Sequence, residues 1–331
     1  MAERELWELR QMQALPLDAK VSMTMQRIRE WYNYWDGNVY ISYSGGKDST
    51  VLKHIVKQMY SNVPAVFADT GLEYPEIRSF AMSQDDVVTV KPKKNFRQVI
   101  ETYGYPIISK EVAKVVQYAR SGGKDNTHYK KLFGTLTYKG ERSPYCCEKW
   151  SFLYDAPFKI SSRCCDVMKK EPLHRYESET GRKPYIATMA DESLNRTTAW
   201  LRAGCNAFES SKPRSQPMSF WTEQDVLQYI RKNNIDICSV YGEVVEAGQI
   251  QMPLFGEYEC QLKTTGCYRT GCVFCMFGIM YDRDRFTRLK KTHPALYDYC
   301  INGGEFVGDE WKPNRKGLGL GYVLDYIGVN Y

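Results

Sequence analysis

The stretch Ser44-Gly45-Gly46-Lys47-Asp48-Ser49-Thr50 decides the fold of this chain. It follows a β-rich run, Asn38–Tyr43, and it opens Ser49–Met59, whose apolar residues recur at helical spacing. The paired glycines favour a tight turn, because glycine adopts backbone conformations that other residues avoid. The stretch therefore predicts a strand, a glycine loop and a helix, in that order.

The alternation of strands and helices continues downstream. We expect a second apolar strand over Pro64–Asp69, a helix from about Pro75 to Met82 and a third strand over Asp86–Lys91. Tyr185–Ala190 is expected to add a fourth strand. Such alternation is typical of a parallel sheet with right-handed crossover connections. The chain is therefore predicted to have an α/β fold with a doubly wound parallel sheet.

Three consecutive segments are indicated by the pattern along the chain. Residues 1–35 have apolar residues at helical spacing and are expected to form an N-terminal helical segment. Residues 36–205 hold the predicted sheet domain. Beyond about residue 206 the alternation fades, so residues 206–331 are expected to form a small irregular C-terminal lobe that carries cysteines. Within it, Thr222–Asp225 is expected to begin a helix with a capping box.

Composition and charge exclude several classes of protein. Hydrophobic residues make up 43% of the 331 residues and charged residues 25%, which excludes a disordered or fibrous chain. The formal net charge of +6 is compatible with phosphate-bearing ligands or nucleic acid. Every apolar run is far shorter than the roughly 20 residues of a membrane-spanning helix, and the first residues lack a secretory signal pattern. We expect a cytoplasmic protein with no membrane partner.

The glycine loop has the chemistry of a phosphate-binding site. Inward-facing N–H groups and the positive end of the following helix attract anions. Lys47 adds a full charge and is expected to face solvent, outside the core. The hydroxyl groups of Ser44, Ser49 and Thr50 add donors. The G-x-x-x-x-G-K-[ST] spacing of a Walker A loop is absent, which disfavours ordinary kinase or GTPase chemistry. The structural alternative is a plain strand-to-helix turn.

The eleven cysteines favour metal binding over disulfides, because their number is odd and no export signal precedes them. The candidate metal ligands form a vicinal pair and a C-x4-C-x2-C run. They are Cys164, Cys165, Cys267, Cys272 and Cys275. Thiolates bind zinc or iron–sulfur clusters, so both metals and unliganded thiols stay open. We expect a second vicinal pair, Cys146-Cys147, to play no part.

Six motifs in order give the chain its resemblance to a known family. The glycine loop matches the S-G-G-x-D-S PP-loop of the N-type ATP pyrophosphatases, and five further stretches resemble their phosphoadenylylsulfate (PAPS) reductase-like branch. These stretches are Phe67–Glu76 (D-T-G-x-x-F/Y-P-E), Cys164–Leu173 (C-C-x-x-x-K-x-x-P-L), Ala190–Arg196 (A-x-E-S-x-x-R), Trp221–Val226 (W-T-x-x-D-V) and Gly271–Cys275 (G-C-x-x-C). The resemblance extends from about residue 36 to residue 278.

The resemblance implies binding of ATP or a related adenine nucleotide with Mg²⁺, and chemistry at the α-phosphate. The implied nucleotide contacts are Ser44, Gly45, Gly46, Lys47, Asp48, Ser49, Thr50, Asp69 and Thr70. Lys47, Asp48 and Arg196 are the expected catalytic residues. Lys47 would stabilise developing negative charge, and Asp48 would orient Mg²⁺ or the loop itself. Arg196 would be a second phosphate clamp, its alternative being a surface ion pair with Asp191 or Glu192.

In the cluster-bearing branch of this family, a C-C pair and a distant C-x-x-C hold a [4Fe–4S] cluster. The resemblance therefore implies such a cluster here. Five thiols compete for four positions, so one of Cys164, Cys165 and Cys267 is expected to be spare. Lys169 and Lys170 follow the pair; they would raise the potential of the cluster or form a solvated helix face.

The chain departs from the sulfonucleotide reductases near its C-terminus. Those enzymes carry a nucleophilic cysteine in an E-C-G-x-H tail, whereas no cysteine follows Cys300 here. We therefore predict an ATP-dependent adenylylating enzyme that releases pyrophosphate and transfers sulfur, as in the related DNA phosphorothioation sulfurtransferases, with nucleic acid as the acceptor. Tyr281–Lys291, which combines cations with aromatic residues, suits a phosphate backbone or forms an amphipathic helix with a basic face.

Two other classes of function stay open. The first is reduction of an adenylylated sulfur compound by an external thiol. The second is a non-catalytic module that binds or senses nucleotide through the cluster. In each class a partner protein, or a donor of sulfur or electrons, is expected.

Overall fold

The computed structural model describes residues 4–251 and 258–331, which divide into two compact units. Unit 1 comprises Met1–Asp69, Glu73–Lys91 and Leu173–Thr270; unit 2 comprises Thr70–Leu72, Pro92–Pro172 and Gly271–Tyr331. Both units are discontinuous in sequence, so they do not coincide with the consecutive segments 1–35, 36–205 and 206–331. Over the two described ranges, no helix has both the length and the apolar character needed to cross a membrane.

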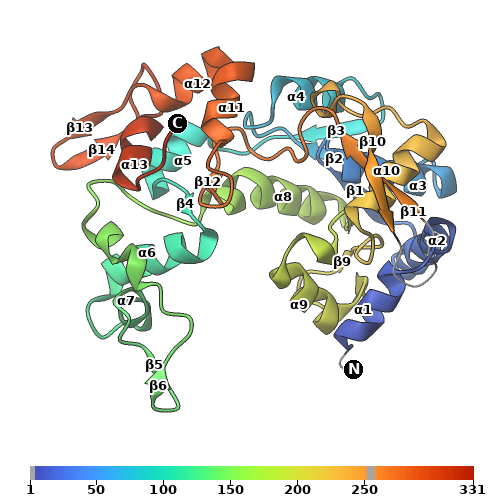
Figure 1. Ribbon diagram of the computed structural model, residues 1–331, viewed down its shortest axis with the longest axis horizontal. Coiled ribbons are helices and arrows are strands. Elements are labelled where there is room, and N and C mark those ends of the chain that lie inside the picture. Colours follow the sequence, from blue (N-terminus) through green and yellow to red (C-terminus); the bar gives the residue numbers. More distant parts are fainter. Residues whose placement is uncertain (1–3, 252–257) are drawn as a thin grey trace. The chain divides into compact units, whose positions relative to one another are not determined.

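A six-stranded sheet forms the centre of unit 1, in the order β3-β2-β1-β7-β9-β8 (Figure 1). The strands are β1 (Val39–Tyr43), β2 (Ala65–Ala68), β3 (Val87–Val90), β7 (Lys183–Ile186), β8 (Asn206–Ala207) and β9 (Arg214–Ser215). The neighbours from β3 to β9 pair in parallel, and only β8 is antiparallel, to β9. In the register, Ile41 lies opposite Ala65 on one side and Tyr185 on the other. The predicted α/β fold with a parallel sheet is confirmed.

The fourth strand begins and ends earlier than predicted. The sequence pattern indicated Tyr185–Ala190, whereas β7 spans Lys183–Ile186. The chain then leaves the sheet and forms the 3-10 turn η3 (Ala190–Glu192). The Met189 N–H donates to the Glu192 carboxylate at 2.9 Å, which stabilises this turn. The apolar run therefore contributes both the end of a strand and the start of a turn.

The helices of unit 1 pack on the sheet through apolar faces. They are α1 (Leu6–Gln13), α2 (Leu17–Tyr34), α3 (Lys47–Met59), α4 (Pro75–Met82), α9 (Leu194–Ala203) and α10 (Glu223–Asn233), with α8 (Glu171–Thr180) beginning in unit 2 and continuing into unit 1. α3 buries Val51, Leu52, Ile55 and Val56. Two further elements follow α10: the 3-10 turn η4 (Ser239–Tyr241) and the hairpin β10 (Val244–Gln251) and β11 (Tyr258–Thr264).

Unit 2 is built from helices and short strand pairs. Its helices are α5 (Phe96–Tyr103), α6 (Lys110–Gly122), α7 (Thr127–Leu132), α11 (Arg285–Thr292), α12 (Pro294–Ile301) and α13 (Leu320–Tyr326), with the 3-10 segment η1 (Glu148–Asp155) and the π-helical turn η2 (Asp166–Lys170). Its strands are β4 (Ile107–Ile108), β5 (Thr137–Tyr138), β6 (Glu141–Arg142), β12 (Met276–Phe277), β13 (Glu305–Val307) and β14 (Glu310–Lys312). They pair as β4–β12, β5–β6 and β13–β14.

The W-T-x-x-D-V motif connects α10 to α2 in the core of unit 1. The buried Lys20 ammonium donates to both carboxylate oxygens of Asp225, at 2.7 and 2.8 Å. Asp225 also accepts hydrogen bonds from the N–H and hydroxyl of Thr222, which completes the predicted capping box. Trp221, fully buried, donates through Nε1 to the Thr24 hydroxyl at 2.9 Å. The motif therefore has a structural role in this chain.

Asp225→Ala is expected to lower the free energy of unfolding by about 3–5 kcal/mol, because it leaves the Lys20 ammonium buried without its partner. Urea unfolding followed by circular dichroism measures this change. Lys232→Ala is the matched control, since Lys232 joins the same two helices through an exposed ion pair with Asp18. We expect the control to change the stability by less than about 1 kcal/mol. Equal effects of the two substitutions would contradict the structural role.

Candidate nucleotide site

The glycine loop lies at the carboxyl end of β1, where the chain turns into α3. Gly45 has a φ of +71°, and a Cβ there would lie 3.0 Å from the side chain and carbonyl of Ile77, so only glycine fits. The hydroxyls of Ser44 and Ser49 are 3.0 Å apart, and Ser49 donates to the Gly46 carbonyl at 2.8 Å. Thr50 donates to the same carbonyl at 3.0 Å. The loop is thus held open in a fixed conformation beside the positive end of α3.

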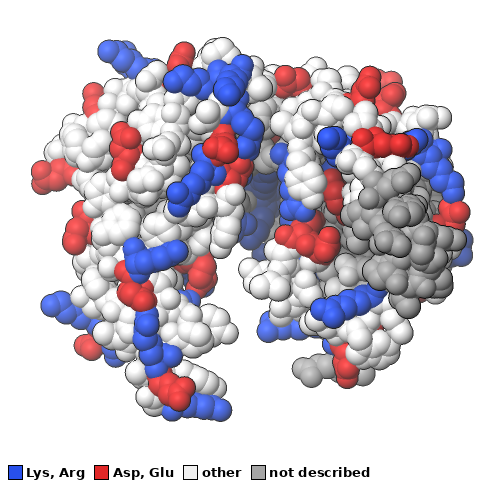
Figure 2. Space-filling view, viewed as in Figure 1, with Lys and Arg blue, Asp and Glu red and all other residues white. Residues whose placement is uncertain are grey.

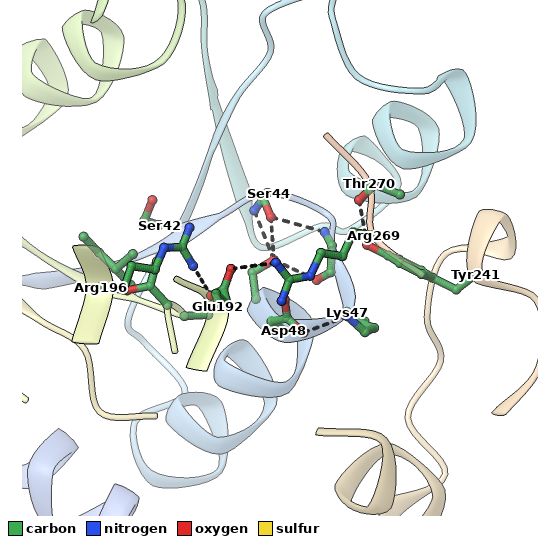
Figure 3. Close-up of a pocket in the computed structure, with 14 residues that line it drawn as sticks. Ser42, Ser44, Lys47, Asp48, Glu192, Arg196, Tyr241, Arg269 and Thr270 are labelled. Carbon is green, nitrogen blue, oxygen red and sulfur yellow. Dashed lines mark hydrogen bonds and ion pairs between the residues drawn. The ribbon is translucent and has the colours of Figure 1, made fainter. Parts of the chain in front are cut away.

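A cavity of about 260 Å³ faces this loop (Figure 3). Its walls come from the loop, from the residues that follow β7, from the start of α9 and from the segment before Gly271. The lining residues are Ser42, Ser44, Gly46, Lys47, Asp48, Ser49, Ile186, Ala187, Thr188, Glu192, Arg196, Tyr241, Arg269 and Thr270. Three strongly basic side chains and hydroxyl donors therefore converge on one space, which is what a polyphosphate requires.

Lys47 is not solvent-facing, and that expectation was wrong. Its side chain is only 2% exposed, because α3 starts inside the unit and carries Lys47 in its first turn. The ammonium lies 3.1 Å from Asp48 and 3.0 Å from Glu223, and above the ring of Tyr241. Burial tends to lower the pKa of Lys47, but the two carboxylates outweigh it and the pKa is raised. Lys47 therefore stays a cation beside the cavity.

Two arginines share one carboxylate on the wall of the cavity. Arg196 forms an ion pair with Glu192, and Arg269 lies 3.8 Å from the other oxygen of the same carboxylate (Figure 3). Arg196 thus lines the cavity and forms the ion pair with Glu192 that was expected as its structural alternative, while its role as a phosphate clamp stays a prediction. Arg269 and Tyr241 also line the cavity and were not predicted from the sequence. The one available signal was that Arg269 is the basic residue just before the G-C-x-x-C motif.

Asp69 and Thr70 are buried but do not line this cavity. The Asp69 carboxylate accepts two hydrogen bonds from Arg78, at 2.8 and 2.9 Å. The Thr70 hydroxyl accepts a hydrogen bond from the Leu72 N–H at 3.1 Å. Their contact with adenine stays a prediction. Asp48 accepts a hydrogen bond from Lys47 at 3.1 Å, and both roles expected for it, orienting Mg²⁺ or orienting the loop, stay predictions.

Four of the five candidate metal ligands belong to unit 2. Cys164 and Cys165 precede the π-helical turn η2, and Cys272 and Cys275 lie in the turn before β12. Burial raises the pKa of the Cys164 thiol, and the charges of Cys165, Cys272 and Cys275 raise it further. Burial also raises the pKa of Cys275, with a contribution from Cys165. Cys164 is therefore within electrostatic range of the other three thiols.

Basic groups surround these four thiols. Lys169 lowers the pKa of both Cys164 and Cys275, against the dominant effect of burial. Arg285 also acts on Cys275 and donates to the Cys275 carbonyl at 2.7 Å. Positive charge of this kind favours thiolates over thiols. Within the described ranges, however, no three His, Cys, Asp or Glu side chains are disposed to hold a metal ion as they stand.

The remaining cysteines lie elsewhere. Cys267 belongs to unit 1, where its N–H donates to the Val240 carbonyl at 2.9 Å. Burial raises the pKa of Cys147 to about 11, and the neighbouring thiol of Cys146 contributes to this increase. All eleven cysteines are within the described residues and none forms a disulfide.

The basic-aromatic segment Tyr281–Lys291 contains an amphipathic helix, α11. Phe286 and Leu289 are buried, and Arg285 and Arg288 form ion pairs with Asp282 at 3.1 and 2.6 Å. On the face seen in Figure 2, Lys and Arg are interspersed with Asp and Glu. The segment thus has the basic helix face expected as its structural alternative, and two of its arginines are already engaged within the chain.

The chain is similar to a family model, to named relatives and to a solved structure. A family model described as the phosphoadenosine phosphosulfate reductase domain matches residues 38–142 and 139–277. Proteins named sulfate adenylyltransferase subunit 2, from Shewanella baltica (strain OS223) and Shewanella oneidensis, are 25% and 26% identical over 288 residues, covering 81% of this chain and 83% of theirs. A crystal structure of PAPS reductase from Candida auris, in a phosphate complex, gives a TM-score of 0.37 at 16% identity, covering 65% of this chain and 82% of that one.

Proposed function

Because the chain belongs to the phosphoadenosine phosphosulfate reductase domain family, and is thus an enzyme of the PAPS reductase-like class, we propose that it is an ATP-dependent adenylyltransferase that releases pyrophosphate. One observation carries the proposal: the glycine loop, Lys47, Arg196 and Arg269 all face a single cavity. The size and charge of this cavity suit a polyphosphate chain. The resemblance of the loop to a PP-loop selects ATP over other phosphate ligands.

In the proposed reaction an oxygen of the acceptor attacks the α-phosphorus of ATP. The bond from that phosphorus to the bridging oxygen breaks, and its electron pair leaves with pyrophosphate. The N–H groups of the loop and Lys47 are positioned to stabilise the added negative charge. Arg196 and Arg269 would hold the leaving pyrophosphate by charge-assisted hydrogen bonds. Mg²⁺ would enter as the counter-ion of the ATP phosphates.

The names of the relatives favour adenylyl–sulfur chemistry. Those relatives are named as a subunit of sulfate adenylyltransferase, and they align with most of this chain. We therefore include a partner subunit in the proposal, as well as a sulfur-containing acceptor or product. The sequence predicts sulfur transfer onto nucleic acid, so nucleic acid is one of the acceptors to be tested.

The proposal also includes a [4Fe–4S] cluster held by Cys164, Cys165, Cys272 and Cys275. The chemistry of the donor set suits such a cluster, because all four thiols belong to unit 2 and the cations of Lys169 and Arg285 act on Cys275. When bound, such a cluster supplies electron transfer or a site for sulfur chemistry. Lys169 and Arg285 would stabilise the thiolates, and the hydrogen bond from Arg285 to the Cys275 carbonyl would orient the turn that carries two of them.

Pyrophosphate release from ATP tests the proposed function. It is measured with sulfate, an adenylylated sulfur compound or nucleic acid as the added acceptor, with and without a sulfur donor. Arg269→Ala is expected to lower the rate of pyrophosphate release about 10- to 100-fold, because it removes a hydrogen bond to a charged phosphate group. Arg231→Ala is the control, because that arginine forms an exposed ion pair with Glu246. Absence of pyrophosphate with every acceptor would leave the non-catalytic module as the better description.

A further inference from the structure

Glu223 is a buried carboxylate that the proposed chemistry does not use. It is the first residue of α10, and its side chain is 12% exposed. Its ion pair with Lys47 spans 3.0 Å. Among the residues that the structure describes, no group donates a hydrogen bond of good geometry to either of its oxygens. Nearly all the stabilisation of its negative charge therefore depends on Lys47.

The other charges near Glu223 come from two neighbouring segments. Asp48, on α3, is a second carboxylate and disfavours a negative charge on Glu223. Arg269, before the cysteine turn, favours that charge but contributes less than Lys47 does. The ring of Tyr241 lies 5.6 Å from the Lys47 ammonium. Lys47 is thus the principal cation at this carboxylate.

A bound polyphosphate competes with Glu223 for Lys47. The cavity region holds three cations, Lys47, Arg196 and Arg269, against three carboxylates, Asp48, Glu192 and Glu223. This arrangement is close to neutral before the nucleotide arrives. A phosphate that takes Lys47 leaves the two buried oxygens of Glu223 without their partner.

We propose that Glu223 is a positioning residue that holds Lys47 in the nucleotide-free protein and takes up one proton from solvent when Lys47 turns to the nucleotide phosphate. The inference rests on the proposed function. The proton comes from water or buffer and ends on a Glu223 oxygen, and no other bond changes. A buried carboxylate that loses its cation is neutralised, because solvating its charge there costs several kcal/mol.

The direction of the linkage follows from this exchange. Burial is the main cause that raises the pKa of Glu223, and Lys47 is the main cause that lowers it. When Lys47 moves away, the pKa rises further and the carboxylate binds a proton. A complex that binds one more proton than the free protein is favoured at low pH. The affinity for ATP should therefore fall as the pH rises through the raised pKa of Glu223 in the complex.

Calorimetry in two buffers with different enthalpies of ionisation tests the inference. For wild-type protein and ATP we expect an uptake of up to about one proton per nucleotide, which grows as the pH falls. Glu223→Gln should lower that uptake, and the difference isolates Glu223, since the nucleotide's own phosphate titrates equally in both proteins. Asp48→Asn is the matched control: Asp48 also pairs with Lys47 but is 29% exposed, so water can solvate it when Lys47 moves.

The outcomes separate the two proposals. ATP binding with no proton uptake in the wild type, or with the same uptake in Glu223→Gln, would overturn the role of Glu223 while leaving the nucleotide site intact. No ATP binding by the wild type would overturn the proposed function and this inference together. A loss of proton uptake in Asp48→Asn, with uptake retained in Glu223→Gln, would assign the proton to Asp48 and would also refute the inference.

Discussion

Lys47→Ala is expected to abolish measurable ATP binding and, in addition, to lower the free energy of unfolding by about 3–5 kcal/mol. Binding is lost because the substitution removes the cation that faces the phosphates. Stability is lost because Glu223 stays buried without its ion-pair partner. Calorimetry with ATP and urea unfolding measure the two effects separately. This expectation differs from that for a solvent-facing lysine, whose removal would spare the fold.

A double variant separates the two effects of Lys47. Lys47→Ala combined with Glu223→Gln should recover much of the lost stability, because the unpaired charge is gone, but it should not recover ATP binding. Lys57→Ala, on the same helix, is the control, since its pairing with Asp86 lies away from the loop. Equal ATP affinity of wild type and Lys47→Ala would refute the assignment of the nucleotide to the glycine loop.

Local patterns were enough to predict the part of the fold that holds the loop. β1, β2 and β3 each form a short apolar run bounded by residues that favour turns, so their order and parallel pairing follow from the alternation with helices. The Thr222–Asp225 capping box was predicted for the same reason. The fourth strand was placed too late, because an apolar run does not show where a side chain such as Glu192 draws the chain out of the sheet.

The rest of the site depends on contacts that no local pattern reveals. Glu223 and Arg269 reach the loop from positions far along the chain, and neither stands out in its own segment. The burial of Lys47 follows from the packing of α10 against α3, which the sequence motifs do not show. The two units are likewise defined by long-range contacts, so each is assembled from separate stretches of the chain.

Cysteine variants are expected to divide into two groups when the protein is purified without oxygen. The wild type should be brown, with about four irons per chain, as a tetrathiolate cluster requires. Serine at any of Cys164, Cys165, Cys272 or Cys275 should abolish the colour and most of the iron. It should also destabilise unit 2, because ligand binding contributes folding energy. Absorbance, iron analysis and thermal unfolding measure these three effects.

Serine at Cys267, Cys146 or Cys147 should leave the colour and the iron content unchanged. Cys267 is the informative control, because it stands only five residues before Cys272 and yet belongs to unit 1. We infer that it is the spare thiol of the five, since the other four all belong to unit 2. Loss of iron in Cys267→Ser with retention in Cys165→Ser would reverse that assignment.

A colourless anaerobic preparation with one zinc per chain would replace the cluster with a structural zinc site, because four thiolates suit zinc equally well.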